Sequence, residues 1–172
     1  MKSFKRIKNR LITKLTSHSA YLKKRFIQGL ETTETEGIPW TPLKKPLAEC
    51  KVAVVTTAGI HHKDQPTFDM MDLNGDPTFR IIDATLPIET LMITHDYYDH
   101  SDADKDINIV FPIERLKELE AEKVIGKVSR THYGFMGHIK GPHVRTLIDQ
   151  KVPEVVEILK KDSVDVVLLT PG

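Results

Sequence analysis

The sequence predicts an open, doubly wound α/β fold of the Rossmann or flavodoxin type, with a mostly parallel sheet. Three observations indicate this fold class. Runs of β-branched and other apolar residues end in glycine or in polar turns, as strands buried on both faces do. Amphipathic segments with helical spacing lie between these runs. A strand, a helix and a second strand in succession imply a crossover connection and parallel pairing.

Four segments are predicted to form strands, namely 51–59 (KVAVVTTAG), 90–95 (TLMITH), a short segment after Gly126, and 164–169 (VDVVLL). Two segments are predicted to form helices, namely 112–126, with Pro112 in its first turn and Gly126 as its stop, and 144–159, which Pro153 interrupts. An apolar strand at the end of a sheet exposes unpaired backbone groups. The last strand is therefore expected either to be interior by pairing order or to belong to a longer chain, so the fold is expected to be incomplete at its C-terminus.

Composition excludes several classes of protein. The 172 residues suit one domain with a core, and the net charge of +1 gives no general attraction to nucleic acid. No apolar run approaches the roughly 18 residues that a membrane span requires. The single cysteine, Cys50, excludes an internal disulfide framework and indicates a cytoplasmic location. Because Cys50 precedes a strand rather than following one, it is predicted to be a buried, unreactive thiol.

The first thirty residues differ in charge from the rest of the chain. Residues 1–30 contain nine cations and no anion, with apolar residues at loosely helical spacing. They are predicted to form a basic amphipathic extension that packs on the body or on a partner. A membrane-surface helix and a transit peptide are less favoured alternatives. A linker over 31–48, anchored by Trp40, would lead to the α/β domain over 49–172.

Three polar stretches are candidates for a site. The stretch 69–80 begins like a calcium loop but lacks that loop's glycine and glutamate, so a turn is predicted. The stretch 95–112 contains five carboxylates and two imidazoles directly after a strand. It is interpreted as a capped loop, with an active-site loop and a metal site as alternatives, and no metal ligand is predicted. The glycines of 132–142 match neither nucleotide-binding fingerprint.

Five stretches together resemble one family in their order and approximate spacing. They are 38–70 (IPWTPLKKPLAECKVAVVTTAGIHHKDQPTFDM), 75–83 (GDPTFRIID), 93–119 (ITHDYYDHSDADKDINIVFPIERLKEL), 134–139 (GFMGHI) and 162–172 (DSVDVVLLTPG). They resemble the selenoprotein B subunits of the glycine, sarcosine, betaine and D-proline reductases. The resemblance covers about 38–172 and leaves the basic extension outside.

The resemblance implies a chemistry and partners. These enzymes reductively cleave a carbon–nitrogen bond α to a carboxylate in an amino-acid-like substrate, with thiols as the reductant. A selenolate attacks the α-carbon, and for glycine and proline a pyruvoyl-bearing partner subunit holds the amine. In the family, selenocysteine or cysteine directly follows the strand and turn that match VVLLTPG. This chain ends at Gly172. It is therefore expected to be truncated before its nucleophile, to carry no cofactor of its own, and to be inactive alone.

Twelve residues are predicted to line a site at the carboxyl edge of the sheet. They are Thr56, Thr57, Gly59, His61, His95, Tyr98, Asp99, Asp102, Asp106, Asn108, His138 and Thr170. Hydroxyl and amide groups would bind a substrate carboxylate, histidines would move a proton, and the aspartates would either take part or only brace the loop. Two other functions remain open: a non-catalytic binding or assembly protein, with a homo-oligomer as one form, and a membrane-surface protein.

Overall fold

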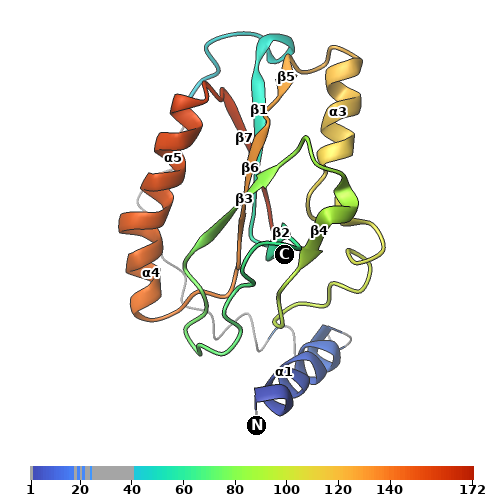
Figure 1. Ribbon diagram of the computed structural model, residues 1–172, viewed down its shortest axis with the longest axis vertical. Coiled ribbons are helices and arrows are strands. Elements are labelled where there is room, and N and C mark those ends of the chain that lie inside the picture. The colour runs from blue at the N-terminus through green and yellow to red at the C-terminus, as the bar shows by residue number, and fades with distance from the viewer. Residues whose placement is uncertain (1, 18, 20, 22–23, 25–40) are drawn as a thin grey trace.

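The structure is a computed structural model that describes residues 2–17, 19, 21, 24 and 41–172. Much of the predicted linker, including Trp40, lies outside the described residues. Within them the fold is the predicted α/β class, with a mostly parallel sheet between helices (Figure 1). Among the described residues, no helix has the length and apolar content needed to cross a bilayer.

The main sheet is built around its first strand. Its members are β1 (Lys51–Thr56), β3 (Phe79–Asp83), β5 (Lys127–Val128), β6 (Thr131–Phe135) and β7 (Val166–Thr170). On one side β1 pairs in parallel first with β5 and then with β6, and on the other side it pairs in parallel with β7. β3 is the exception, because it runs antiparallel to β6. This arrangement makes β1 the central strand.

Alternating side chains of β1 explain why helices cover both faces of the sheet. Val52 and Val54 belong to the core cluster that includes residues of α3 (Ile113–Ala121). Ala53 points the other way and belongs to the cluster that includes α5 (Val152–Lys161). Figure 1 shows these two helices on opposite sides of the sheet. The continuous apolar run of β1 is thus the pattern of a strand buried on both faces.

Proline shapes the long helix on one face. α4 (Pro142–Thr146), the π-helical turn η4 (Leu147–Lys151) and α5 follow one another without a break. Pro153 has no N–H to donate, and its ring crowds the preceding turn. The predicted interruption takes the form of a widened turn just before Pro153, and Pro153 then stands in the first turn of α5.

The helix α3 ends before the predicted stop at Gly126. Pro112 is its N-cap rather than its first helical residue, and Lys123, with φ 61°, adopts a left-handed conformation just after the helix. The N–H groups of Val124 and Ile125 both donate to the carbonyl of Leu119. Lys123 therefore terminates the helix, a role that its residue type does not predict.

The predicted strand 90–95 does not join the main sheet. Its core, β4 (Leu91–Ile93), pairs antiparallel with β2 (Ile60–His62) in a separate two-stranded sheet. Gly59 turns the chain out of β1 with φ 75°, and its carbonyl accepts from the Thr94 N–H. Short 3₁₀ turns complete the described elements, namely η1 (Leu47–Glu49), η2 (Ile88–Thr90) and η3 (Ile107–Ile109).

The last strand, β7, is an edge strand rather than an interior one. It pairs with β1 on one side, and no described strand pairs with its other side. Leu169 is 73 % exposed, so the apolar run that predicts a buried strand is only partly covered. The predicted burial of Cys50 is confirmed, since this residue is fully buried just before β1.

Candidate functional site

Three strands end together at the carboxyl edge, and two hydroxyls there share one acceptor. The Oγ1 atoms of Thr56 and Thr170 donate to the carbonyl of Val110, at 3.1 and 2.7 Å. The N–H of Thr57 donates to the carbonyl of Thr170 at 3.0 Å. These donors, expected to bind a substrate carboxylate, are therefore engaged within the protein. The Thr57 side chain itself is exposed at this edge.

The end of the chain lies against the turn after β1. A Cβ on Gly172 would stand 3.1 Å from the Cβ of Ala58. The carbonyl of Ala58 accepts a hydrogen bond from the Tyr98 hydroxyl at 3.1 Å. Gly59 is buried and its N–H donates to Phe135 at 2.8 Å, so it shapes the turn rather than facing a ligand. Tyr98 and Gly172 thus both lie next to Ala58.

Rings from two segments cluster beside Tyr98. The ring centroids of His95 and Tyr98 are 4.8 Å apart, and His138 stacks on Tyr97 at 3.7 Å. The Nδ1 atom of His95 accepts from the Tyr97 N–H at 3.0 Å, so a neutral His95 carries its proton on Nε2. The predicted residues His95, Tyr98 and His138 therefore do come together.

Burial sets the ionisation of this ring cluster. Burial, together with the nearby charges of His138 and His100, lowers the pKa of His95 to about 4, while Asp96 opposes them. Burial also lowers the pKa of His138, and burial together with Asp104 raises the pKa of Tyr98. At neutral pH His95 is therefore an uncharged imidazole that can donate from Nε2.

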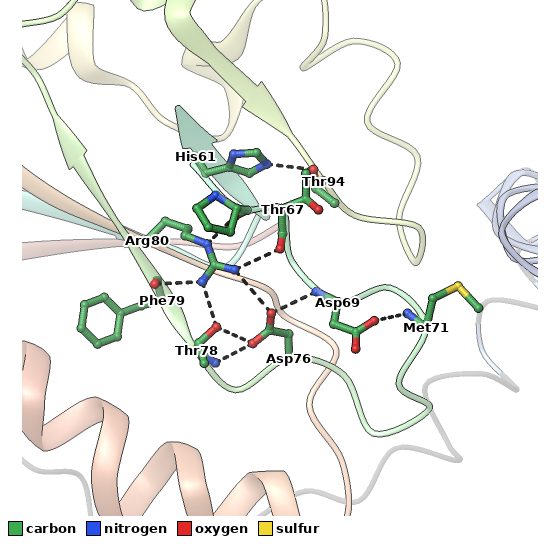
Figure 2. A network of polar contacts seen from close by, with 10 residues as sticks. His61, Thr67, Asp69, Met71, Asp76, Thr78, Phe79, Arg80 and Thr94 are labelled. Carbon is green, nitrogen blue, oxygen red and sulfur yellow. Dashed lines mark hydrogen bonds and ion pairs between the residues drawn. The ribbon is translucent and has the colours of Figure 1, made fainter. Parts of the chain in front are cut away.

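His61 lies apart from this cluster. Its Nδ1 donates to the carbonyl of His62 at 2.7 Å, and its Nε2 accepts from the Thr94 hydroxyl at 2.8 Å. The side chain is fully buried at the small sheet, and burial lowers its pKa (Figure 2). Both ring nitrogens are used, so His61 ties β2 to the end of β4.

The aspartates after the ring cluster mainly brace their own loop. Asp99 accepts from the Ser101 N–H at 3.2 Å, and Asp102 pairs with Lys105 at 2.7 Å. Asp106 caps η3 by accepting from the N–H of Asn108 at 3.0 Å. These contacts fit the capped-loop interpretation. Within the described residues, no group of three or more histidine, cysteine or acidic side chains is arranged to hold a metal ion.

Asp96, which is not among the twelve predicted site residues, joins this loop to the N-terminal helix. Its side chain is fully buried and bonds to two arginines of α1 (Lys2–Ser17). The Arg6 Nε lies 2.8 Å from Oδ2, and the Arg10 Nε lies 3.0 Å from Oδ1. Burial opposes the ionisation of Asp96, but these hydrogen bonds outweigh it and hold its pKa below the ordinary value. Partners about ninety positions away leave no local sequence signal.

Arg80 organises the stretch predicted to be a turn (Figure 2). Its guanidinium donates to the carbonyls of Pro66, Thr67 and Phe79 and lies 4.4 Å from the ring centroid of Phe68. Asp76 accepts from the N–H groups of Asp69 and Thr78, at 3.0 and 2.9 Å. The aspartates here close turns, which confirms the turn prediction.

Two clefts flank the aspartate loop. A cleft of about 740 Å³ lies beside β4, and Asp106, Asn108 and Lys63 line it. A second cleft of about 240 Å³ lies between α1 and the turn that contains Tyr98 and Asp99. Arg10 lines both clefts. Of the predicted residues, Tyr98, Asp99, Asp106 and Asn108 line these clefts, and Arg10 brings the basic extension into contact with both.

A model of the glycine/sarcosine/betaine reductase selenoprotein B family matches residues 3–172. The chain belongs to this family. The match begins inside the basic extension, so the family pattern reaches further towards the N-terminus than the five stretches indicated. No solved structure gives a significant match.

Curated relatives of this selenoprotein B family chain are named as reductase subunits. It is 38 % identical to the D-proline reductase subunit gamma of Acetoanaerobium sticklandii, over 77 % of this chain and 53 % of that protein. It is 33 % identical to the glycine reductase complex component B subunit gamma of Symbiobacterium thermophilum, over 77 % of this chain and 31 % of that protein. A betaine reductase complex component B subunit beta of Peptoclostridium acidaminophilum is 30 % identical over 73 % of this chain. The matched region spans about half of the first relative and a third of the second.

Proposed function

We propose that this chain is the N-terminal part of a cytoplasmic reductase subunit that takes part in reductive cleavage of a carbon–nitrogen bond α to a carboxylate. Substrates would be small amino acids or their N-methylated forms, of the kind for which its relatives are named. A dithiol would supply two electrons and become a disulfide, while the amine leaves and the carbon gains a proton. A pyruvoyl-bearing subunit would be the partner that holds the amine.

The observation that carries this proposal is the position of Gly172. It lies against Ala58 at the carboxyl edge of the sheet, where open α/β folds place their chemistry. A residue that followed it would begin close to Ala58, whose carbonyl accepts from the Tyr98 hydroxyl, and the His95 ring packs against Tyr98. A selenocysteine at that position would supply a strong nucleophile at neutral pH. The Nε2–H of a neutral His95 would assist either the nucleophile or the leaving amine.

A second observation supports a polypeptide that continues past Gly172. The only cysteine, Cys50, is fully buried at the amino end of β1, so it lies away from this edge. The described residues therefore place no thiol at the carboxyl edge. The uncovered side of β7 and the greater length of the relatives point the same way. A non-catalytic assembly protein of the same fold is the alternative.

The test is the intact mass of the protein from its native source, followed by an assay of the complex that contains it. We expect a mass above 19.6 kDa that includes selenium or a second cysteine. With dithiothreitol as reductant, the complex should release ammonia, methylamine or trimethylamine from glycine, sarcosine or betaine, or open the ring of D-proline. A native mass of 19.6 kDa would overturn the catalytic proposal and leave the assembly protein.

A further inference from the structure

We propose that the outward face of α1 is a docking surface for another subunit of the reductase complex, and that the docked surface is apolar with a rim of carboxylates. The inference rests on the proposed function only in naming the partner as a reductase subunit. Its evidence is the orientation of α1, the composition of its outer face and the sign of its charges.

Two ion pairs fix the rotation of α1 about its axis. Arg6 and Arg10 bond to the buried carboxylate of Asp96, and the Thr13 hydroxyl lies 3.3 Å from the Asp96 carbonyl oxygen. Positions i, i+4 and i+7 share one face of a helix. The polar face of α1 therefore points at the body, and the helix cannot turn without separating these charges.

The opposite face carries the large apolar side chains. Phe4, Ile7, Leu11 and Leu15 form one stripe at helical spacing and are 75, 52, 57 and 67 % exposed. In a surface helix the apolar stripe ordinarily faces the core and the charged side faces water. Here the orientation is reversed, so the stripe needs a cover from outside the described residues. Figure 1 places α1 at the lower end of the molecule, where a second protein can reach it.

The charges on α1 indicate what kind of surface would dock on the apolar stripe. The helix holds six cations and no anion, and by helical spacing the exposed Lys8 flanks the stripe, whereas Lys14 lines the cleft between α1 and the body. A second copy of α1 would bring lysine against lysine, which disfavours self-association through this face. A surface with carboxylates around an apolar centre would complement both the stripe and its flanks.

A protein fits the rigid orientation of α1 better than a lipid surface does. A helix that binds a bilayer needs only a free apolar face. The buried carboxylate of Asp96 holds α1 in one rotation about its axis. A helix that is already held in its binding orientation loses less entropy when it docks on a partner of complementary shape. The named relatives are subunits or components of reductases, which supports a protein partner.

The test places a photo-crosslinking residue at Leu11 in tagged protein produced in the native host. Leu73, which is 70 % exposed on a loop, is the matched control position. We expect position 11 to cross-link to one identified reductase subunit, through a peptide with apolar and acidic residues, and position 73 not to do so. Leu11→Asp with Leu15→Asp should remove that subunit from the purified complex, while Leu73→Asp should retain it. Lys8→Glu should weaken association severalfold at low salt and less at high salt.

Two results would overturn the proposal. The first is a double aspartate variant that retains every subunit. The second is stripe-dependent binding to phosphatidylglycerol vesicles with no subunit lost, which would assign the face to lipid. Hydrogen exchange of α1 shows whether the variant helix is still docked. A complex that assembles through α1 but releases no amine would separate failure of the proposed activity from failure of the docking surface.

Discussion

At the scale of single residues, buried polar groups hold this fold in place through specific partners. His132 is fully buried in β6, and its Nδ1 accepts from the Val54 N–H of β1 at 2.8 Å. A neutral imidazole is needed for that bond, because a protonated ring has no acceptor. Burial lowers the pKa of His132 to about 4, with the Ser129 backbone opposing it.

We expect the free energy of unfolding to fall as the pH falls from about 6.5 to about 4. Between these two pH values the unfolded chain binds a proton at His132 and the folded chain does not. The contribution of His132 to the free energy of unfolding is therefore fully present above about pH 6.5 and is lost as the pH falls towards 4. The loss from one such histidine is at most about 3 kcal/mol. Urea denaturation at pH 7, 6, 5 and 4.5 measures it.

His132→Asn is the matched variant for this prediction. Its Oδ1 retains an acceptor for the Val54 N–H but takes up no proton. The slope of stability against pH should therefore be shallower than in the wild type, with His95 supplying part of what remains because its pKa is also lowered to about 4 by burial. An unchanged slope would show that the pKa of His132 does not differ between the folded and the unfolded chain.

At the scale of elements, close approach of two backbones decides where β2 can lie. A Cβ on Gly134 in β6 would collide with the carbonyl oxygen of Ile60 in β2. Gly134→Ala should therefore destabilise the fold by about 1–3 kcal/mol, as overpacking does. Gly137→Ala is the control, because its Cβ would stand 3.1 Å from the Thr57 oxygen and needs only a small shift. Equal midpoints in urea for the two variants would contradict this account.

The exposed edge of β7 makes a second prediction for an element. Leu169→Lys should change the stability of the 172-residue chain by less than about 0.5 kcal/mol, because Leu169 is 73 % exposed. It should also reduce aggregation, since a lysine on an edge strand opposes pairing with other chains. Urea denaturation and light scattering measure the two effects. A large loss of stability would show that this side of β7 is covered in solution.

At the scale of the whole molecule, one buried carboxylate joins the N-terminal helix to the body. Asp96→Asn removes the charge that Arg6 and Arg10 share, and hydrogen bonds to a charged group contribute about 1.5–3 kcal/mol. Because an isolated helix of this length is marginal in water, an undocked α1 should exchange its amide hydrogens quickly.

Hydrogen exchange read by mass spectrometry tests this attachment. Residues 2–17 should lose protection in Asp96→Asn while β1 keeps it. Asp83→Asn is the control, since Asp83 pairs with the exposed Arg130 at 2.8 Å and does not touch α1. Retained protection over 2–17 would show that other contacts hold the helix.

The accuracy of the sequence predictions follows from the range of the interactions involved. The runs at β1 and β7 and the amphipathic pattern of α5 predict elements correctly, because strand and helix periods are local. His95 and Tyr98 are both predicted to line one site because they follow the same strand, and their rings do lie 4.8 Å apart. The pairing of β4 with β2 was missed, because it depends on a turn at Gly59 that redirects the chain.

The sequence by itself determined the α/β class, the buried Cys50, the capped aspartate turns and the family to which the chain belongs. Each of these depends on residue type or on spacing within a short segment. Only the tertiary structure decided that β7 lies at an edge, that Thr56 and Thr170 share one carbonyl, and that α1 turns its charged face inward to Asp96. Those outcomes depend on contacts between distant segments, where the gain from one buried carboxylate outweighs the local preference of an apolar stripe to face the core.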